Sequence, residues 1–156
     1  ASSIDIAKLF KPLKRSLSLV MTGEQEVALK YKAKVISRPS NLATDTSPEI
    51  DSWKHAIKFL KQSGDSFDRF ISLPTTAPLR SKIDIENALN ALTDSSDVVV
   101  TITESARNPF FNLMRYNEDG YLETFAGKNL IQRRQDATEC LDLTTVTYVA
   151  SPDYIL

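Results

Sequence analysis

Cysteine, histidine and glycine are scarce in this sequence, and each shortage excludes a class of site. Cys140 is the single cysteine and His55 the single histidine among 156 residues, and there are 4 glycines. One cysteine cannot form an internal disulfide, and these two residues cannot supply a zinc site between them. So few glycines leave no loop of the GxGxxG or GxxxxGK[ST] type for a phosphate. A lone cysteine suits a reducing compartment, so we predict a cytoplasmic protein.

Excess charge, long apolar runs and known catalytic spacings are also missing. The formal net charge is −1, which gives no basic field for nucleic acid or for an anionic membrane. No apolar run is long enough to cross a bilayer, and no signal-peptide pattern is present. Serine, histidine and acidic residues show no nucleophile-elbow or triad spacing, so the catalytic residues stay unknown. Hydrophobic residues at 42% and charged ones at 25% indicate one soluble domain with a core, spanning residues 1–156.

What the sequence does contain is an alternation of strand and helix patterns. Alternating units of this kind predict an α/β fold with a mostly parallel sheet. The β-branched run at residues 97–103 (DVVVTIT) is typical of a strand that is buried on both faces. The expected order is strand 17–22, helix 24–32, strand 34–37, helix 46–63, strand 70–73, helix 81–92, strand 97–103, hairpin 108–125 and strand 144–150, with a helix starting at 151.

Two of the helices carry start signals. Residues 46–49 (TSPE) read as a capping box with a proline in the first turn, and Gly64 ends that helix. Ser81 and Asp84 form a similar cap. His55 lies off the apolar face of its helix, which favours a solvent-facing side chain over a catalytic base. The apolar faces comprise Ile50, Trp53, Ala56, Ile57 and Leu60 in the first helix, and Ile85, Ala88, Leu89 and Leu92 in the second.

Three polar clusters are candidates for binding an anion. Residues 74–80 lie between an apolar strand and a helix start, where α/β proteins hold anions on free backbone N–H groups. Arg38 ends a strand shortly before residues 45–47 at a helix start, an arrangement that can hold a phosphate or a base edge. Residues 132–136 (QRRQD) carry two adjacent arginines suited to a carboxylate. The ordinary alternatives are a plain connection, helix capping and a solvated charged surface.

Several motifs occur in the order found in one enzyme family. They are Arg38-Pro39 with residues 42–47 (LATDTS), residues 73–80 (LPTTAPLR), residues 97–103 and residues 133–136 (RRQD). From about residue 19 to the end, the chain resembles the acylneuraminate cytidylyltransferases, which include CMP-sialic acid synthetases and relatives for legionaminic and pseudaminic acids. The resemblance implies transfer of CMP from CTP to the anomeric hydroxyl of a 2-keto sugar acid, with Mg²⁺ and release of pyrophosphate. It also implies a homodimer and a three-layer Rossmann-like sheet of the nucleotide-diphospho-sugar transferase type, with a β-hairpin excursion.

The same resemblance assigns roles to individual residues. Arg38 and Ser47 are expected beside the cytosine, and Asp45 is expected to support the turn between them. The residues implied to bind the nucleotide are Arg38, Asp45, Ser47, Thr75, Thr76 and Arg80. Those implied to bind the sugar acid are Arg134, Gln135, Thr144 and Tyr148.

Some family motifs are missing or changed. The first loop, roughly IPARxGSKxxxxKN, supplies an arginine and lysines for the triphosphate and is absent, although residues 8–13 (KLFKPL) resemble the family segment just after that loop. The acidic DIDTxxD motif that holds Mg²⁺ is expected beyond Leu156, so the metal ligands stay unknown. The QPTSPLR loop has lost its glutamine, and Thr144-Thr145 replaces an Asn-Gly pair, which leaves the sugar open. We therefore expect an incomplete cytidylyltransferase domain.

The missing motifs leave two alternatives open. If these 156 residues are the whole protein, it lacks the residues that bind the triphosphate and the metal. That case favours a non-catalytic module that binds a nucleotide or a sugar on the same scaffold. The change at Thr144-Thr145 also fits a related transferase that acts on another sugar. In all three cases CTP or a sugar acid, rather than nucleic acid or a membrane, is the expected partner.

Overall fold

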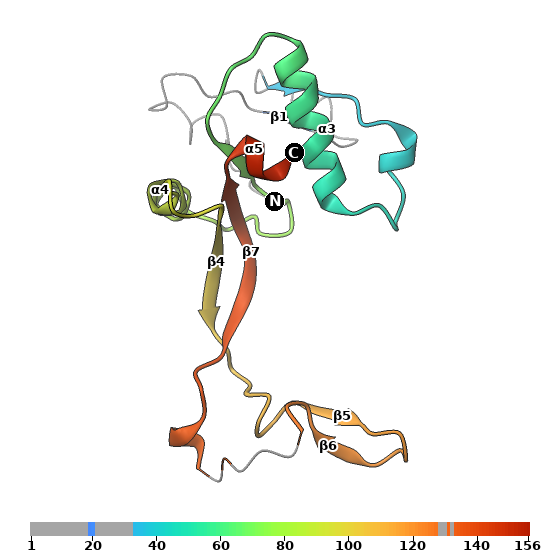
Figure 1. Cartoon of the computed structure of the whole chain (residues 1–156), viewed down its shortest axis with the longest axis vertical. Helices are drawn as coiled ribbons and strands as arrows, with labels where there is room; N and C mark the ends of the chain where they lie inside the picture. The colour runs from blue at the N-terminus through green and yellow to red at the C-terminus, as the bar shows by residue number, and fades with distance from the viewer. Residues whose placement is uncertain (1–18, 21–32, 128–130, 132) are drawn as a thin grey trace. The chain divides into compact units, whose positions relative to one another are not determined.

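The computed structural model describes residues 19–20, 33–127, 131 and 133–156. They fold as two compact units. Figure 1 shows the chain coloured by residue number. Unit 1 comprises residues 1–100 and 145–156, and unit 2 comprises Thr101–Thr144. The helix expected at residues 24–32, the segment at 8–13 and Gln132 lie outside the described residues. The expectation of a single cytidylyltransferase domain stays a prediction.

The helices and strands follow the expected order, with changed bounds. The 3₁₀ helices η1 and η2 were not foreseen. The strands predicted at 17–22 and 34–37 are present as β1 and β2, with two residues each. The described elements are β1 (Leu19–Val20), β2 (Lys34–Val35), η1 (Ser40–Leu42), α3 (Glu49–Gln62), β3 (Phe70–Ser72), α4 (Lys82–Ala91), β4 (Val98–Glu104), β5 (Met114–Tyr116), β6 (Leu122–Thr124), η2 (Arg134–Asp136), β7 (Leu141–Ala150) and α5 (Pro152–Ile155).

The strand directions correct the expectation of a mostly parallel sheet. The pair β1–β2 is parallel, but β3 pairs with β7 antiparallel and β5 pairs with β6 antiparallel. The sheet order is β3-β7-β4, and the N–H of Ser105 donates to the carbonyl of Cys140 just beyond the β4–β7 ladder. The chain after β4 returns as β7 directly beside it, and such a return pairs antiparallel. A mixed α/β fold is confirmed, whereas the layered Rossmann-like sheet stays a prediction.

Helix α3 corrects one predicted cap and confirms the other end. Its N-cap is Pro48, whose side chain has no acceptor for a capping bond. The hydroxyl of the predicted cap, Thr46, lies 3.3 Å from that of Thr44 in the preceding turn. At the other end the N–H of Asp65 donates to the carbonyl of Leu60, and Gly64 has φ +83°. This is a Schellman motif, which needs a residue in the left-handed region and so favours glycine.

The apolar face of α3 is confirmed in part. Ala56, Ile57 and Leu60 are buried, whereas Ile50 is exposed. His55 is half-buried rather than solvent-facing, because its Nε2 lies 3.2 Å from the carbonyl oxygen of Ser37. The helix therefore packs on a narrower stripe than the periodicity predicted.

Helix α4 is confirmed at its start and along its face. The hydroxyl of Ser81 accepts from the N–H of Asp84, and the Asp84 carboxylate accepts from the N–H of Ser81, which completes the capping box. All four predicted apolar residues, from Ile85 to Leu92, are buried.

Both larger helices of unit 1 pack against the C-terminal end of β7. The α4 cluster includes Val149 of that strand. Ile57 of α3 forms a cluster with the next strand residue, Ala150, and with Ile155 of α5, beside which α3 lies in Figure 1. Successive residues of a strand point to opposite faces, so this end of β7 is covered on both sides.

The strand β4 is less buried than predicted. Val98, Val100 and Ile102 are 40%, 39% and 55% exposed, and they alternate with half-buried residues. Among the described residues, α4 packs against Val99 and leaves the alternate positions open. The β-branched run therefore predicted a strand correctly and its burial on both faces wrongly.

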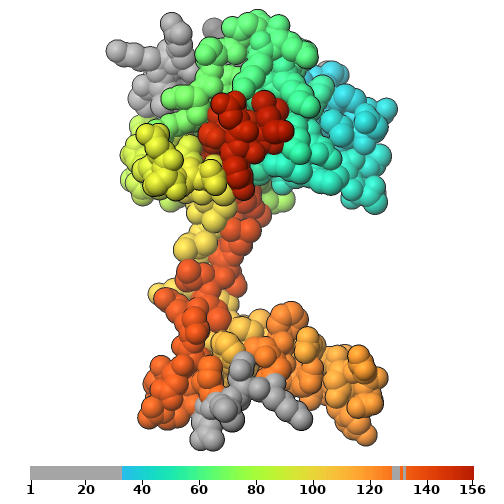
Figure 2. Space-filling model, in the orientation of Figure 1, coloured from blue at the N-terminus to red at the C-terminus, as the bar shows by residue number. Residues whose placement is uncertain are grey.

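Unit 2 contains the predicted hairpin. Strands β5 and β6 pair from Met114 to Thr124, and the Oδ1 of Asn117 accepts from the N–H groups of Asp119 and Tyr121. Gly120 closes the turn with φ +82°. Figure 2 shows this hairpin in light orange. Among the residues that the structure describes, no helix has both the length and the apolar character to cross a membrane.

Candidate functional site

The loop between β3 and α4 is fastened to β7 by a single arginine. Arg80 donates from Nε to the carbonyl of Val146 at 2.8 Å and from Nη2 to the carbonyl of Pro74. Its side chain is half-buried, and burial lowers the pKa of this guanidinium. The predicted phosphate loop is therefore an ordered connection whose arginine is engaged with backbone carbonyl groups.

The two threonines of this loop are exposed. The hydroxyl of Thr76 donates to that of Thr145 on β7 at 3.2 Å, and Thr75 makes no hydrogen bond within the described part of the chain. Thr75 and Thr76 therefore present polar groups beside the strand without being buried. Such a surface can accept a ligand without first breaking core contacts.

Arg38 carries an unsatisfied donor at the start of the second predicted cluster. Its Nε is buried and has no hydrogen-bond partner among the described residues. A buried unpaired donor costs about 1–3 kcal/mol, so a ligand oxygen that accepts from this atom would be stabilising. Arg38 itself lies in the chain between β2 and the 3₁₀ helix η1.

The turn after Arg38 is held by hydroxyl groups. The Oγ of Ser47 lies 2.7 Å from that of Thr44 and donates to the carbonyl of Asn41 at 3.0 Å. Asp45 is exposed, and its carboxylate makes no hydrogen bond or ion pair within the described residues. Thr44 and Ser47 therefore support this turn, and the role expected for Asp45 stays a prediction.

Tyr148 belongs to an aromatic cluster in unit 1 that sequence reasoning missed. Its ring centroid lies 5.6 Å from that of Trp53, which in turn lies 5.4 Å from that of Phe70. The indole N–H of Trp53 donates to Oε1 of Glu49 at 3.2 Å. The periodicity of α3 marked Trp53 as apolar, but no local signal could pair it with a residue on the last strand.

The adjacent arginines of unit 2 have different surroundings. Arg133 donates from Nε and Nη2 to both carboxylate oxygens of Asp136, each at 2.8 Å, and this pairing raises the pKa of Arg133. Arg134 lies with its guanidinium carbon 5.9 Å from the ring centroid of Phe111 and has no acidic partner among the described residues. Of the pair, Arg134 is therefore the one available to a ligand carboxylate. Gln135 beside it is exposed.

A hollow of about 300 Å³ in unit 2 includes Arg134. Arg107 also lines it, and this arginine too makes no ion pair within the described part. Sequence reasoning missed Arg107 because it stands alone in a loop. Thr144 is not in this hollow, and its hydroxyl donates to that of Thr101 at 2.7 Å.

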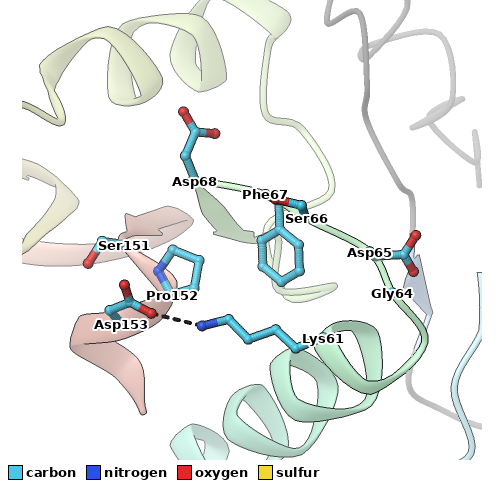
Figure 3. A pocket seen from close by; sticks show the side chains of 9 residues that line it. All are labelled: Lys61, Gly64, Asp65, Ser66, Phe67, Asp68, Ser151, Pro152 and Asp153. Carbon is cyan, nitrogen blue, oxygen red and sulfur yellow. Dashed lines mark hydrogen bonds and ion pairs between the residues drawn. The ribbon is translucent and has the colours of Figure 1, made fainter.

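A larger hollow, of about 450 Å³, lies in unit 1 at the end of α3 and contains none of the predicted site residues (Figure 3). Lys61 and Asp153 form an ion pair across it at 2.8 Å. Asp65 is likewise paired, with Lys34 at 3.2 Å. Across the described ranges, no three His, Cys, Asp or Glu residues gather in a way that could hold a metal ion.

Several known proteins are similar to this chain. Over 156 residues the chain is 30% identical to "Post-translational flagellin modification protein B" of Campylobacter coli, a match that covers 96% of this chain and 63% of that protein. It is 28% identical over 115 residues to "Pseudaminic acid cytidylyltransferase" from two strains of Campylobacter jejuni subsp. jejuni, covering 73% of this chain and 50% of each relative. The chain is therefore similar to proteins that include two cytidylyltransferases.

The matches cover part of each relative. The chain spans between half and 63% of the length of the curated relatives it matches. No protein-family model matches it. The resemblance inferred from the motifs is thus supported at the level of a cytidylyltransferase-like family, and the roles of single residues stay predictions.

Proposed function

We propose that this chain is part of a cytidylyltransferase that transfers CMP from CTP to a nine-carbon 2-keto sugar acid. The observation that carries the proposal is its similarity, over 73% of its length, to two pseudaminic acid cytidylyltransferases. Pseudaminic acid is therefore the first candidate substrate. Sialic and legionaminic acids are the next ones, because Thr144-Thr145 departs from the family pattern at the sugar site.

Two features of unit 1 support nucleotide binding. The buried Nε of Arg38 lacks an acceptor among the described residues, which a cytosine or phosphate oxygen can supply as a charge-assisted hydrogen bond. The exposed hydroxyl of Thr75 offers a further donor and that of Thr76 a further acceptor, on a loop that Arg80 holds in place. Asp45 and Ser47 complete the set proposed for the nucleotide.

One feature of unit 2 supports binding of a carboxylate. Arg134 has no acidic partner in the described part of the chain, whereas Arg133 is already paired with Asp136. A free guanidinium fork matches both oxygens of a sugar-acid carboxylate. Gln135 and Thr144, which belong to the same unit, are proposed to contact the rest of the sugar, and the role expected for Tyr148 of unit 1 stays a prediction.

The proposed reaction forms one bond and breaks one. The anomeric hydroxyl oxygen of the sugar acid attacks the α-phosphorus of CTP, the bond to the β-phosphate oxygen breaks, and pyrophosphate leaves while the hydroxyl proton passes to a base. Mg²⁺ stabilises the negative charge of the phosphates in reactions of this kind. The described residues gather no site for it, so Mg²⁺ stays a prediction and no residue here is proposed as its ligand or as the base.

A second copy of the chain is the proposed protein partner. Tyr116, Tyr121 and Leu122 of the hairpin are exposed, and aromatic side chains are enriched in interfaces. These exposed side chains support the proposal of a homodimer, which the family resemblance implies.

The decisive experiment measures pyrophosphate release by the natural full-length protein with CTP, Mg²⁺ and each candidate sugar acid. We expect turnover with pseudaminic acid. Arg134→Ala should raise the KM for the sugar acid about 10- to 100-fold, as loss of a charged hydrogen-bonded contact does, and should raise the KM for CTP less.

Arg133→Ala is the matched control, because it removes the neighbouring arginine that is paired internally. It should change the KM for the sugar acid by less than Arg134→Ala does. Equal effects of both variants on both substrates would contradict the assignment of Arg134. CTP binding without turnover on any sugar acid would favour the non-catalytic module, and neither binding nor turnover would overturn the proposal.

A further inference from the structure

The contacts of Arg80 differ from those expected of an arginine that binds a phosphate. Two of its nitrogens, Nε and Nη2, donate to backbone carbonyls, those of Val146 in the middle of β7 and Pro74 at the start of the loop. No acidic side chain pairs with it in the described part of the chain. The guanidinium is therefore already engaged by the protein's own backbone.

The loop needs such a fastening because its own backbone supplies few hydrogen bonds. Pro74 and Pro78 have no N–H to donate, and the described backbone bonds within the loop include one, from Ala77 to Pro74, at 3.4 Å. Arginine is suited to the task because its planar fork presents several donors in fixed directions. Arg80 thus joins two segments that are 66 residues apart in the chain.

The same fastening fixes the exposed threonines. The hydroxyl of Thr76 meets that of Thr145, the residue before Val146 on β7. Arg80, through its bonds to Pro74 and Val146, and Thr76, through its bond to Thr145, therefore fasten the residues on both sides of Thr75 to neighbouring positions of the same strand. Thr75 lies between the two fastened points, and its hydroxyl makes no hydrogen bond to any described residue.

We propose that Arg80 is a positioning residue that holds the turn of residues 74–78 against β7, so that Thr75 and Thr76 stand in place for the nucleotide. This inference rests on the proposed function and changes the role that the family resemblance gave to Arg80. Holding a group in the reacting geometry is worth large factors in rate, and a misplacement of about 1 Å costs on the order of 100-fold. Arg80 contributes this without touching the substrate.

The test compares Arg80→Lys with Arg80→Gln in the full-length protein. A lysine keeps the charge but has one ammonium group, which cannot span two carbonyls. We expect both variants to lose kcat/KM for CTP by similar factors, on the order of tenfold or more. Arg80→Lys activity near that of the wild type, with a large loss in Arg80→Gln, overturns the proposal and makes Arg80 a charge ligand of the phosphates.

Arg69→Gln is the matched control. Arg69 also donates to a backbone carbonyl, that of Leu89 in α4, but it does not fasten the loop. Its replacement should cost stability without the loss of kcat/KM that the Arg80 variants show. Equal kinetic losses in all three variants would reduce Arg80 to a general stabilising residue and so overturn the proposal.

Hydrogen exchange in the protein without substrates separates this inference from the proposed function. The N–H of Ala77 should exchange at least about tenfold faster in Arg80→Lys and Arg80→Gln than in the wild type, and unchanged in Arg69→Gln. Unchanged exchange in the Arg80 variants overturns the fastening even if the enzyme is active. If exchange is faster in the Arg80 variants but the wild-type protein shows neither turnover nor CTP binding, the positioning role of Arg80 is supported and the proposed function is overturned.

Discussion

Unit 1 and unit 2 differ in where their apolar side chains lie. All buried residues that the structure describes, including the three hydrophobic clusters around α3, α4 and the end of β7, belong to unit 1. In unit 2 none of the described residues is buried, although Met114, Tyr116, Tyr121, Leu122 and Phe125 are large and apolar. The two units therefore have different sources of stability.

The difference shows that apolar side chains can form a core in one unit and lie at the surface of the other. Burial of apolar surface is the dominant favourable contribution to folding, and a two-stranded hairpin alone is at best marginally stable in water. Unit 1 meets this requirement by itself. Unit 2 has apolar side chains in a suitable number but keeps them at its surface, which is consistent with the proposed second copy of the chain burying them.

The largest expected effect comes from truncating the core of unit 1. Ile57 is 0% exposed, and Ile57→Ala should lower the free energy of unfolding by about 2–5 kcal/mol, as other large-to-small core substitutions do. The matched change in unit 2 is Ile102→Ala, at a side chain that is more than half exposed. It should cost less than about 1 kcal/mol.

Urea unfolding of the two variants measures both costs. Equal destabilisation would break the comparison, because it would mean that Ile102 is buried in the protein as it exists in solution. Repeating the measurement over a range of protein concentrations identifies that case, since burial between copies makes stability depend on concentration.

The second effect concerns the surface of unit 2. Replacing Tyr116, Tyr121 and Leu122 together by serine should weaken the proposed dimer by at least about tenfold in Kd, because aromatic side chains dominate interface energies. Light scattering over a dilution series measures the change in mass. Ile83→Ala, at an exposed apolar position on α4 of unit 1, should leave the mass unchanged. A wild-type protein that is monomeric at all concentrations would contradict this prediction.

Local signals in the sequence predicted local structure well. Gly64 after α3, the Ser81–Asp84 box and the Asn117 turn were each readable, because their partners lie within a few residues. Thr46 shows the limit of such reasoning. It carried a capping signal equal to that of Ser81, but its hydroxyl lies beside that of Thr44 and the helix starts later.

Features set by distant partners could not be predicted. The direction of β7 beside β3, the contact of Trp53 with Tyr148 and the bonds of Arg80 all join residues far apart in the chain. The candidate residues themselves came from motif order, which marks what a residue does in relatives. Motif order could not show that Arg133 is paired and that Arg134 has no acidic partner in the described part of the chain, because that depends on the course of the backbone around η2.

The smallest expected effect tests whether the two units respond separately. Ser81→Ala removes the side-chain acceptor at the start of α4 and should cost about 1 kcal/mol, whereas Thr46→Ala, at a position without a capping bond, should change stability by less than about 0.5 kcal/mol. Hydrogen exchange should rise in α4 and stay unchanged in the hairpin of unit 2. Equal acceleration in both units would show that they open as one cooperative body.

The same cap predicts a pH dependence with a definite sign. Hydrogen bonds from the backbone N–H and then the side chain of Ser81 lower the pKa of Asp84 from its ordinary value of 3.8. A carboxylate with a lowered pKa in the folded state adds stability above the unfolded pKa and loses it as the pH falls through the folded pKa. Stability should therefore decline below about pH 4, and Asp84→Asn should flatten that decline without affecting exchange in unit 2. A decline of unchanged size in Asp84→Asn would assign the acid sensitivity to another carboxylate and remove α4 as its source.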